Sequence, residues 1–141
     1  MAQFLFEHRV RYREADPMGI VYHTHYLDYF EVARTEALRK AGLPYKSLED
    51  DGVFMPVVDL AISYRQPAKY DDLLEIRTRL TLSESATRVT FDYEVVRKGE
   101  EDLLVTGHVT LCFFDRKARR PIRAPERIVS LLNEFVSAES A

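Results

Sequence analysis

The sequence predicts an α+β fold in which a five-stranded antiparallel sheet wraps around one long central helix. Two observations carry this prediction. Five segments alternate apolar and polar residues, as half-buried strands do, whereas residues 24–41 repeat their apolar residues with the helical period. The order along the 141 residues is strand, long helix, four strands and a short C-terminal helix. This order favours one sheet packed on one helix, and the length fits a single domain over residues 1–141.

The strands are read from period-two alternation. The first covers residues 4–13, where one face carries Phe4, Phe6, His8, Val10 and Tyr12. We expect the other four at about 53–65, 73–83, 87–98 and 103–115. Residues 98–101 read as a hairpin turn between the last two strands. Because the last four strands are long and follow one another directly, the sheet is expected to be antiparallel.

The long helix is predicted from one apolar stripe and from its two ends. The stripe consists of Tyr26, Phe30, Ala33 and Ala37. Thr24 is a candidate N-cap, and Gly42 is a stop signal. A final short helix is expected to start near Pro125, with one apolar side made by Ile128, Leu131, Leu132 and Phe135. One helix covers only one face of the sheet, so we expect a dimer or larger homo-oligomer.

Composition excludes several classes of protein. Hydrophobic residues make up 46% and charged residues 30%, and the formal net charge is −3. These values are typical of an ordinary globular protein and do not favour nucleic acid as a partner. One basic cluster has two open interpretations, a solvated loop or a contact for a phosphorylated ligand; it consists of Arg116, Lys117, Arg119, Arg120 and Arg123.

No targeting, membrane or metal-binding feature is expected. The N-terminus lacks the apolar core of a signal peptide, and no apolar run approaches the ~20 residues that span a bilayer, so the expected compartment is the cytoplasm. Cys112 is the only cysteine, so no intrachain disulfide forms and we expect a buried side chain. His23 and His25 are two residues apart, whereas a zinc site on a helix favours a spacing of four. We therefore expect no metal and no cofactor.

A turn immediately before the long helix holds the candidate catalytic residue. Glu14-Ala15-Asp16-Pro17-Met18-Gly19 follows the first strand and is a turn signal. Pro17 moves Asp16 out of the helical region, and Gly19 permits a positive φ. On the pattern alone, Asp16 is either a turn initiator or a reactive acid.

The residues from Val10 to Glu36 decide between these readings. They run V-R-Y-R-E-A-D-P-M-G-I-V-Y-H-T-H-Y-L-D-Y-F-E-V-A-R-T-E, and a second segment, Tyr64 to Asp72, reads Y-R-Q-P-A-K-Y-D-D. Together they resemble the 4-hydroxybenzoyl-CoA thioesterase family of hot-dog proteins, and in particular the Tol–Pal-associated branch of acyl-CoA thioesterases. That branch usually reads D-T-D-A-G-G-V-V-Y-H, whereas the Pro-x-Gly form of this chain resembles the original 4-hydroxybenzoyl-CoA enzyme.

The resemblance implies a hot-dog fold, an acyl-CoA substrate and a homodimer that is often paired into a tetramer, with the active sites at the dimer seam. It further implies that Asp16 is catalytic, that Tyr12 and His23 are active-site residues, and that backbone N–H groups near His23 polarise the thioester carbonyl. The candidate substrate-binding residues are Gly19, Tyr22, Met55 and Arg65. The acyl group, CoA or acyl-carrier protein as the carrier, and direct attack or general-base catalysis by Asp16 stay open.

Two other functions compete with this hypothesis. One is a dehydratase or hydratase of the hot-dog type, but those proteins place a catalytic histidine and an acidic partner on the helix, whereas this chain has its acid in the turn before it. The other is a non-catalytic protein that binds an acyl-CoA or an acyl-carrier. No G-x-S-x-G, P-loop or dinucleotide motif is present, so an α/β-hydrolase, an ATPase and a dehydrogenase have no support.

Overall fold

The computed structural model describes the backbone of residues 3–140 and the side chains of residues 3–137. A five-stranded antiparallel sheet in the order β1-β4-β5-β6-β3 dominates the structure, as predicted. Its strands are β1 (Phe4–Arg9), β3 (Val57–Tyr64), β4 (Leu73–Leu82), β5 (Arg88–Arg97) and β6 (Val105–Cys112).

Two of the predicted strands are interrupted by short segments that the alternation did not reveal. Pro56 has no N–H to donate to a ladder, and the predicted strand 53–65 divides there into β2 (Val53–Phe54) and β3. The last predicted strand divides in the same way into β6 and β7 (Phe114–Asp115). With β8 (Arg120–Pro121), the strands β2 and β7 form a small second sheet that was not predicted.

The first predicted strand is too long by four residues. β1 ends at Arg9, and Tyr12–Glu14 form a 3-10 turn, η1. The Val10 N–H still donates to the Asp72 carbonyl at 2.9 Å, in register with the β1–β4 ladder, but the Val10 carbonyl accepts from the N–H of Asp71, whose φ is +71°, and the regular ladder ends here. The placement of Tyr12 on the core face of a strand is therefore wrong, because its side chain is 81% exposed.

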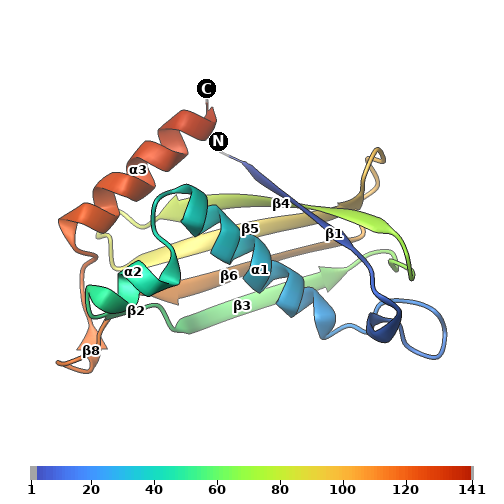
Figure 1. Ribbon diagram of the computed structural model, residues 1–141, viewed down its shortest axis with the longest axis horizontal. Helices are drawn as coiled ribbons and strands as arrows, with labels where there is room; N and C mark the ends of the chain where they lie inside the picture. Colours follow the sequence, from blue (N-terminus) through green and yellow to red (C-terminus); the bar gives the residue numbers. More distant parts are fainter. Residues whose placement is uncertain (1–2, 141) are drawn as a thin grey trace.

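The described residues 3–140 form three α-helices instead of the predicted two. α1 (His25–Lys40) lies across one face of the sheet (Figure 1), and its predicted stripe is buried. α2 (Tyr45–Asp50) lies between the long helix and the second predicted strand, where no helix was predicted. α3 (Glu126–Ser140) has 15 residues, so it is nearly as long as the 16 residues of α1 and not short.

The core lies between α1 and the sheet. The ring of Phe30 on α1 stacks on the ring of Tyr93 on β5, with the centroids 4.1 Å apart and the planes 5° apart. α1 ends at Lys40, and after it the Leu43 N–H donates to Leu38 O at 2.8 Å and the Gly42 N–H to Arg39 O at 3.0 Å. These two bonds satisfy carbonyls that the end of the helix leaves free, as the stop signal predicts.

The strand β3 forms one edge of the large sheet and exposes apolar side chains. Val57, Val58, Leu60 and Tyr64 are each about half exposed. By contrast, β5 and β6 at the centre of the sheet bury their alternate residues. β3 ends at Tyr64, which also lines the hollow described below.

Candidate functional site

The loop that carries Asp16 is a narrow hairpin between η1 and α1. Ala15 and Val21 pair as an isolated antiparallel bridge, and the Asp16 N–H donates to Ile20 O at 2.8 Å. Gly19 lies at the tip of the hairpin with a φ of +80°, a value that residues other than glycine rarely adopt. The turn predicted around Asp16 is thus confirmed, and its backbone is held by its own hydrogen bonds.

Asp16 uses only one of its two carboxylate oxygens within this loop. Its Oδ1 accepts the N–H of Met18 at 2.8 Å and that of Ile20 at 3.4 Å. No residue of the described chain donates to Oδ2. The side chain is half-buried, so one oxygen orients the carboxylate while the other stays available.

A hollow of about 520 Å³ lies beside this loop, between the start of α1 and the end of β3. Four of the predicted site residues line it together: Asp16, Tyr22, His23 and Arg65. The other lining residues are mainly apolar or aromatic: Met18, Ile20, Val21, Tyr26, Tyr64, Gln66 and Pro67. An apolar hollow with a few polar groups is the usual form of a small-ligand site.

The entry to α1 adds free backbone donors beside the hollow, which His23 lines and Thr24 does not. The His25 N–H donates to Tyr22 O at 3.0 Å, but no residue of the described chain accepts from the N–H groups of His23 and Thr24. Such free amides at the start of a helix carry the positive end of its dipole. Tyr64 O–H donates to the His23 carbonyl at 3.1 Å and so ties this backbone to the end of β3. Thr24 occupies the predicted N-cap position but makes no side-chain capping bond.

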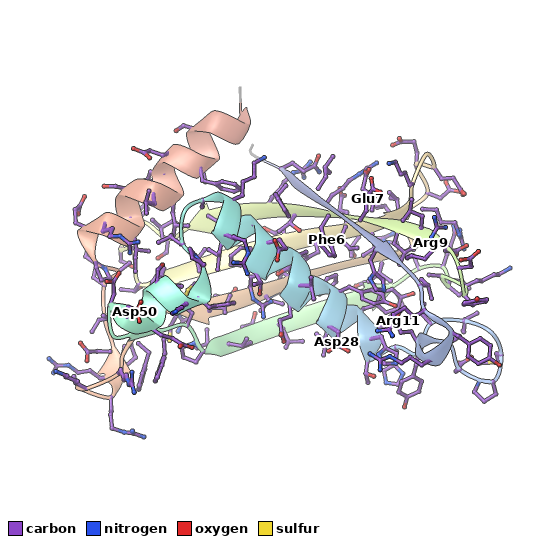
Figure 2. The ribbon with its side chains drawn as sticks, in the orientation of Figure 1. Phe6, Glu7, Arg9, Arg11, Asp28 and Asp50 are labelled. Carbon is purple, nitrogen blue, oxygen red and sulfur yellow. The ribbon has the colours of Figure 1, made fainter. Side chains whose placement is uncertain are left out.

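Figure 2 shows that this end of the molecule is far from α2, with Arg11 and Asp28 at one end and Asp50 at the other. The basic cluster seen in the sequence belongs to the β7–β8 hairpin and the segment after it. This hairpin lies at the same end of the molecule as α2 (Figure 1). Arg116 lies over the Phe54 ring at 5.8 Å, and Arg123 pairs with Glu126 at 3.6 Å. Within one chain, the cluster therefore does not reach the hollow beside Asp16.

Three predicted site residues do not line the hollow. The Tyr12 ring lies edge-on against Tyr70 with the centroids 5.5 Å apart. Gly19 is at the loop tip, where an added Cβ would meet nothing within 4 Å. Met55 is partly buried against the hydrophobic core. The structure thus separates Tyr12 and Met55 from the hollow that contains Asp16.

Glu14 was not predicted, although it is the buried acid nearest to Asp16. Its side chain is one of three polar or charged side chains counted as buried among the described residues, with Arg34 and Thr78. Its Oε1 accepts three hydrogen bonds, from the Arg11 N–H, His8 Nε2 and Tyr29 O–H. Its presence in the quoted motif was the one sequence signal, because the contact with His8 crosses a turn and follows no period.

The remaining surface offers no second cluster of this kind in the described part of the chain. A hollow of about 500 Å³ on the sheet face away from α1 has charged walls that include Arg77, Arg79, Asp92 and Glu94. No three His, Cys, Asp or Glu side chains converge as a metal site requires, among the residues described. None of the described helices has the length and apolar character needed to cross a membrane.

The sequence and the fold match one group of known proteins. Residues 10–132 match the sequence profile of the Thioesterase-like superfamily. The chain is 34% identical to the "Acyl-CoA thioester hydrolase YbgC" of Escherichia coli O157:H7, over 86% of this chain and 90% of that protein. It is 33% identical to the "Putative acyl-CoA thioesterase YneP" of Bacillus subtilis, over 83% of each chain. A solved DHNA-CoA thioesterase of Staphylococcus aureus is 31% identical, with a TM-score of 0.84 over 99% of this chain and 92% of that chain.

Proposed function

Since the chain belongs to the thioesterase-like superfamily of hot-dog proteins, we propose that it hydrolyses the thioester of a short-chain or aromatic acyl-CoA, with Asp16 as the acid that activates the attacking oxygen. The family predicted from the two motifs is confirmed, and the class of enzyme is acyl-CoA thioesterase. The role of Asp16 is the finer claim and needs its own test.

One observation carries this claim: Asp16 lines an apolar hollow and has one oxygen that no described residue occupies. Hydrolysis adds an oxygen to the thioester carbonyl carbon, breaks the C–S bond and gives the acid and free CoA thiol. The free Oδ2 is suited to take a proton from water, or to attack the carbonyl carbon itself before water releases the acid. In either route, the N–H groups of His23 and Thr24 are the donors that we assign to the developing oxyanion.

We assign the other candidates around this centre. His23 and Tyr22 line the hollow and would contact the thioester or the acyl group, and Arg65 would contact the carrier. Gly19 keeps the loop narrow at its tip. Tyr12 is proposed as an active-site residue at the rim, since η1 leads directly into the Asp16 loop. Met55 lies outside the hollow of one chain, and we propose that it contacts the acyl group where that group extends beyond the hollow.

We propose that two copies pair along β3, because this edge strand exposes apolar side chains and ends at the hollow. A two-fold axis beside β3 would place the start of the partner's β3 next to Tyr64 and would close the hollow. Leu60→Glu is expected to yield monomers in sedimentation equilibrium, whereas Leu5→Glu on the opposite edge strand β1 is not. Pairing of these dimers into a tetramer would appear in the same experiment as a larger species.

The test of the proposed function is the release of CoA thiol from acetyl-, butyryl-, 4-hydroxybenzoyl- and longer acyl-CoAs. Asp16→Asn is expected to lower kcat by at least ~10²-fold, because the amide neither takes a proton nor attacks. Asp115→Asn is the matched control, since the Asp115 Oδ1 likewise accepts two backbone N–H groups, those of Lys117 and Ala118, and Asp115 does not line the hollow. Wild-type turnover in folded Asp16→Asn would refute the proposal. Binding of acyl-CoA without release of thiol by the wild type would favour the non-catalytic alternative.

A further inference from the structure

Glu14 is a buried carboxylate on which three elements of the chain converge. Glu14 is 9% exposed, and every donor to its side chain among the described residues bonds to the single oxygen Oε1. The distances from Oε1 are 2.8 Å to the Arg11 nitrogen, 2.9 Å to His8 Nε2 and 3.1 Å to Tyr29 Oη. An acceptor with three donors in a poorly solvated place is costly to remove, since each donor would lose its partner.

The three donors belong to three different parts of the fold. His8 belongs to β1, Tyr29 to the second turn of α1, and the Arg11 N–H to the segment that enters η1. The His8 and Tyr29 rings also pack against each other, with the centroids 4.4 Å apart. Glu14 therefore fixes η1 between the first strand and the long helix.

The backbone of Glu14 transmits this position to the Asp16 loop. The Glu14 carbonyl accepts the Tyr22 N–H at 2.9 Å, and the next residue, Ala15, forms the bridge with Val21. Both arms of the hairpin thus start from Glu14 and its partner Tyr22. A rotation of η1 would move the whole hairpin, including Asp16 and the backbone that leads to His23.

We propose that Glu14 is a positioning residue: its carboxylate, held by His8 and Tyr29, sets where Asp16 presents its free oxygen to the thioester. This inference deepens the proposed function and rests on it. Glu14 itself does not line the hollow and acts only through the loop. A displacement of about 1 Å of a reacting group can lower the rate ~10²-fold, so such a role is measurable.

The experiment compares kcat and KM of variants that remove the acceptor, its charge or one donor. Glu14→Leu, of similar volume, is expected to lower kcat about 30- to 100-fold with KM within about threefold, because the loop moves while the hollow remains. Glu14→Gln keeps Oε1 and is expected to retain kcat within about tenfold, and Tyr29→Phe to lower kcat about three- to tenfold. Tyr45→Phe is the matched control, since it also removes a tyrosine hydroxyl bonded to a charged side chain, Arg34, at the α2 end.

A double-mutant cycle with Asp16→Asn separates positioning from a merely structural role. If Glu14 acts through Asp16, Tyr29→Phe and Glu14→Gln will change the residual kcat of Asp16→Asn by less than about twofold. Effects that multiply in that background, or a Tyr29→Phe variant with wild-type kcat, would overturn the inference even if Glu14→Leu fails to fold. Full activity in Asp16→Asn alone would instead refute the proposed function, so the two failures are distinguishable.

Discussion

Glu14 and Asp16 carry the same acid group two residues apart, yet their surroundings are opposite. Glu14 is buried and its Oε1 accepts hydrogen bonds from β1, α1 and the backbone. Asp16 is half-buried and bonds only to the amides of its own loop. The comparison separates two uses of a carboxylate: Glu14 joins three elements of the chain through Oε1 and holds structure, whereas Asp16 lies at the wall of a hollow with Oδ2 available for chemistry.

The largest expected difference between the two acids is in stability. Glu14→Ala leaves three donors without their acceptor, so we expect the free energy of unfolding to fall by about 2–4 kcal/mol. Asp16→Ala removes only bonds within an exposed loop and is expected to cost less than about 1 kcal/mol. Urea denaturation of both variants measures this. Equal losses of unfolding free energy for the two substitutions would contradict this expectation, because the difference in hydrogen bonding would then not affect stability.

The second expected difference concerns the loop tip. Gly19 and Gly52 both have positive φ, +80° and +74°, and a Cβ at either position meets nothing within 4 Å. Alanine at either site should cost about 1–2 kcal/mol of backbone strain. Only Gly19→Ala moves the loop of Asp16, so only this variant is expected to lower kcat, by about tenfold. Steady-state kinetics with thermal melts of both variants test this, and similar kcat values for the two would contradict it.

Acid titration of stability sharpens the comparison further. Burial raises the pKa of the Glu14 carboxyl, but its three hydrogen bonds and the nearby His8 outweigh burial and hold the pKa below its usual 4.5. A lowered folded-state pKa means that the stabilisation is fully present above pH 4.5 and is lost as the pH falls through the folded value. Below pH 4.5, the free energy of unfolding of Glu14→Gln should therefore decrease less steeply with falling pH than that of the wild type.

The control for this titration is Glu84→Gln in the β4–β5 turn, where Glu84 accepts no hydrogen bond from the described residues. This variant removes one carboxylate and no hydrogen bond of the described chain, so it measures the effect of the lost charge alone. A Glu14→Gln profile that follows that of this control would show that the Glu14 carboxylate is not stabilised in the folded state.

Sequence reasoning succeeded where one period decides the outcome. The stripe of Tyr26, Phe30, Ala33 and Ala37 is buried because a helix repeats every 3.6 residues, and α1 lies flat on the sheet. The turn at Asp16 also followed from local chemistry, since Pro17 and Gly19 restrict the backbone within a few residues.

Sequence reasoning failed where distant segments decide. The regular β1–β4 ladder ends where the Val10 carbonyl accepts from Asp71, 61 positions further along, and the chain then turns into η1, so Tyr12 leaves the strand although the alternation continues through it. Glu14 was missed for the same reason: its donors His8 and Tyr29 come from elements whose packing no period encodes.

Tyr12 provides the smallest expected effect and the sharpest control. Its ring is exposed and packs edge-on against Tyr70, which is also exposed, and neither hydroxyl bonds to a described residue. Both Tyr→Phe substitutions should therefore leave stability within about 0.5 kcal/mol. If Tyr12 belongs to the site, its hydroxyl acts on the bound substrate or its carrier, and Tyr12→Phe should lower kcat/KM about two- to fivefold, the size of one exposed hydrogen bond, whereas Tyr70→Phe should not. Equal kcat/KM for both variants would remove Tyr12 from the site and leave Asp16 as the residue of η1 and its loop that reacts.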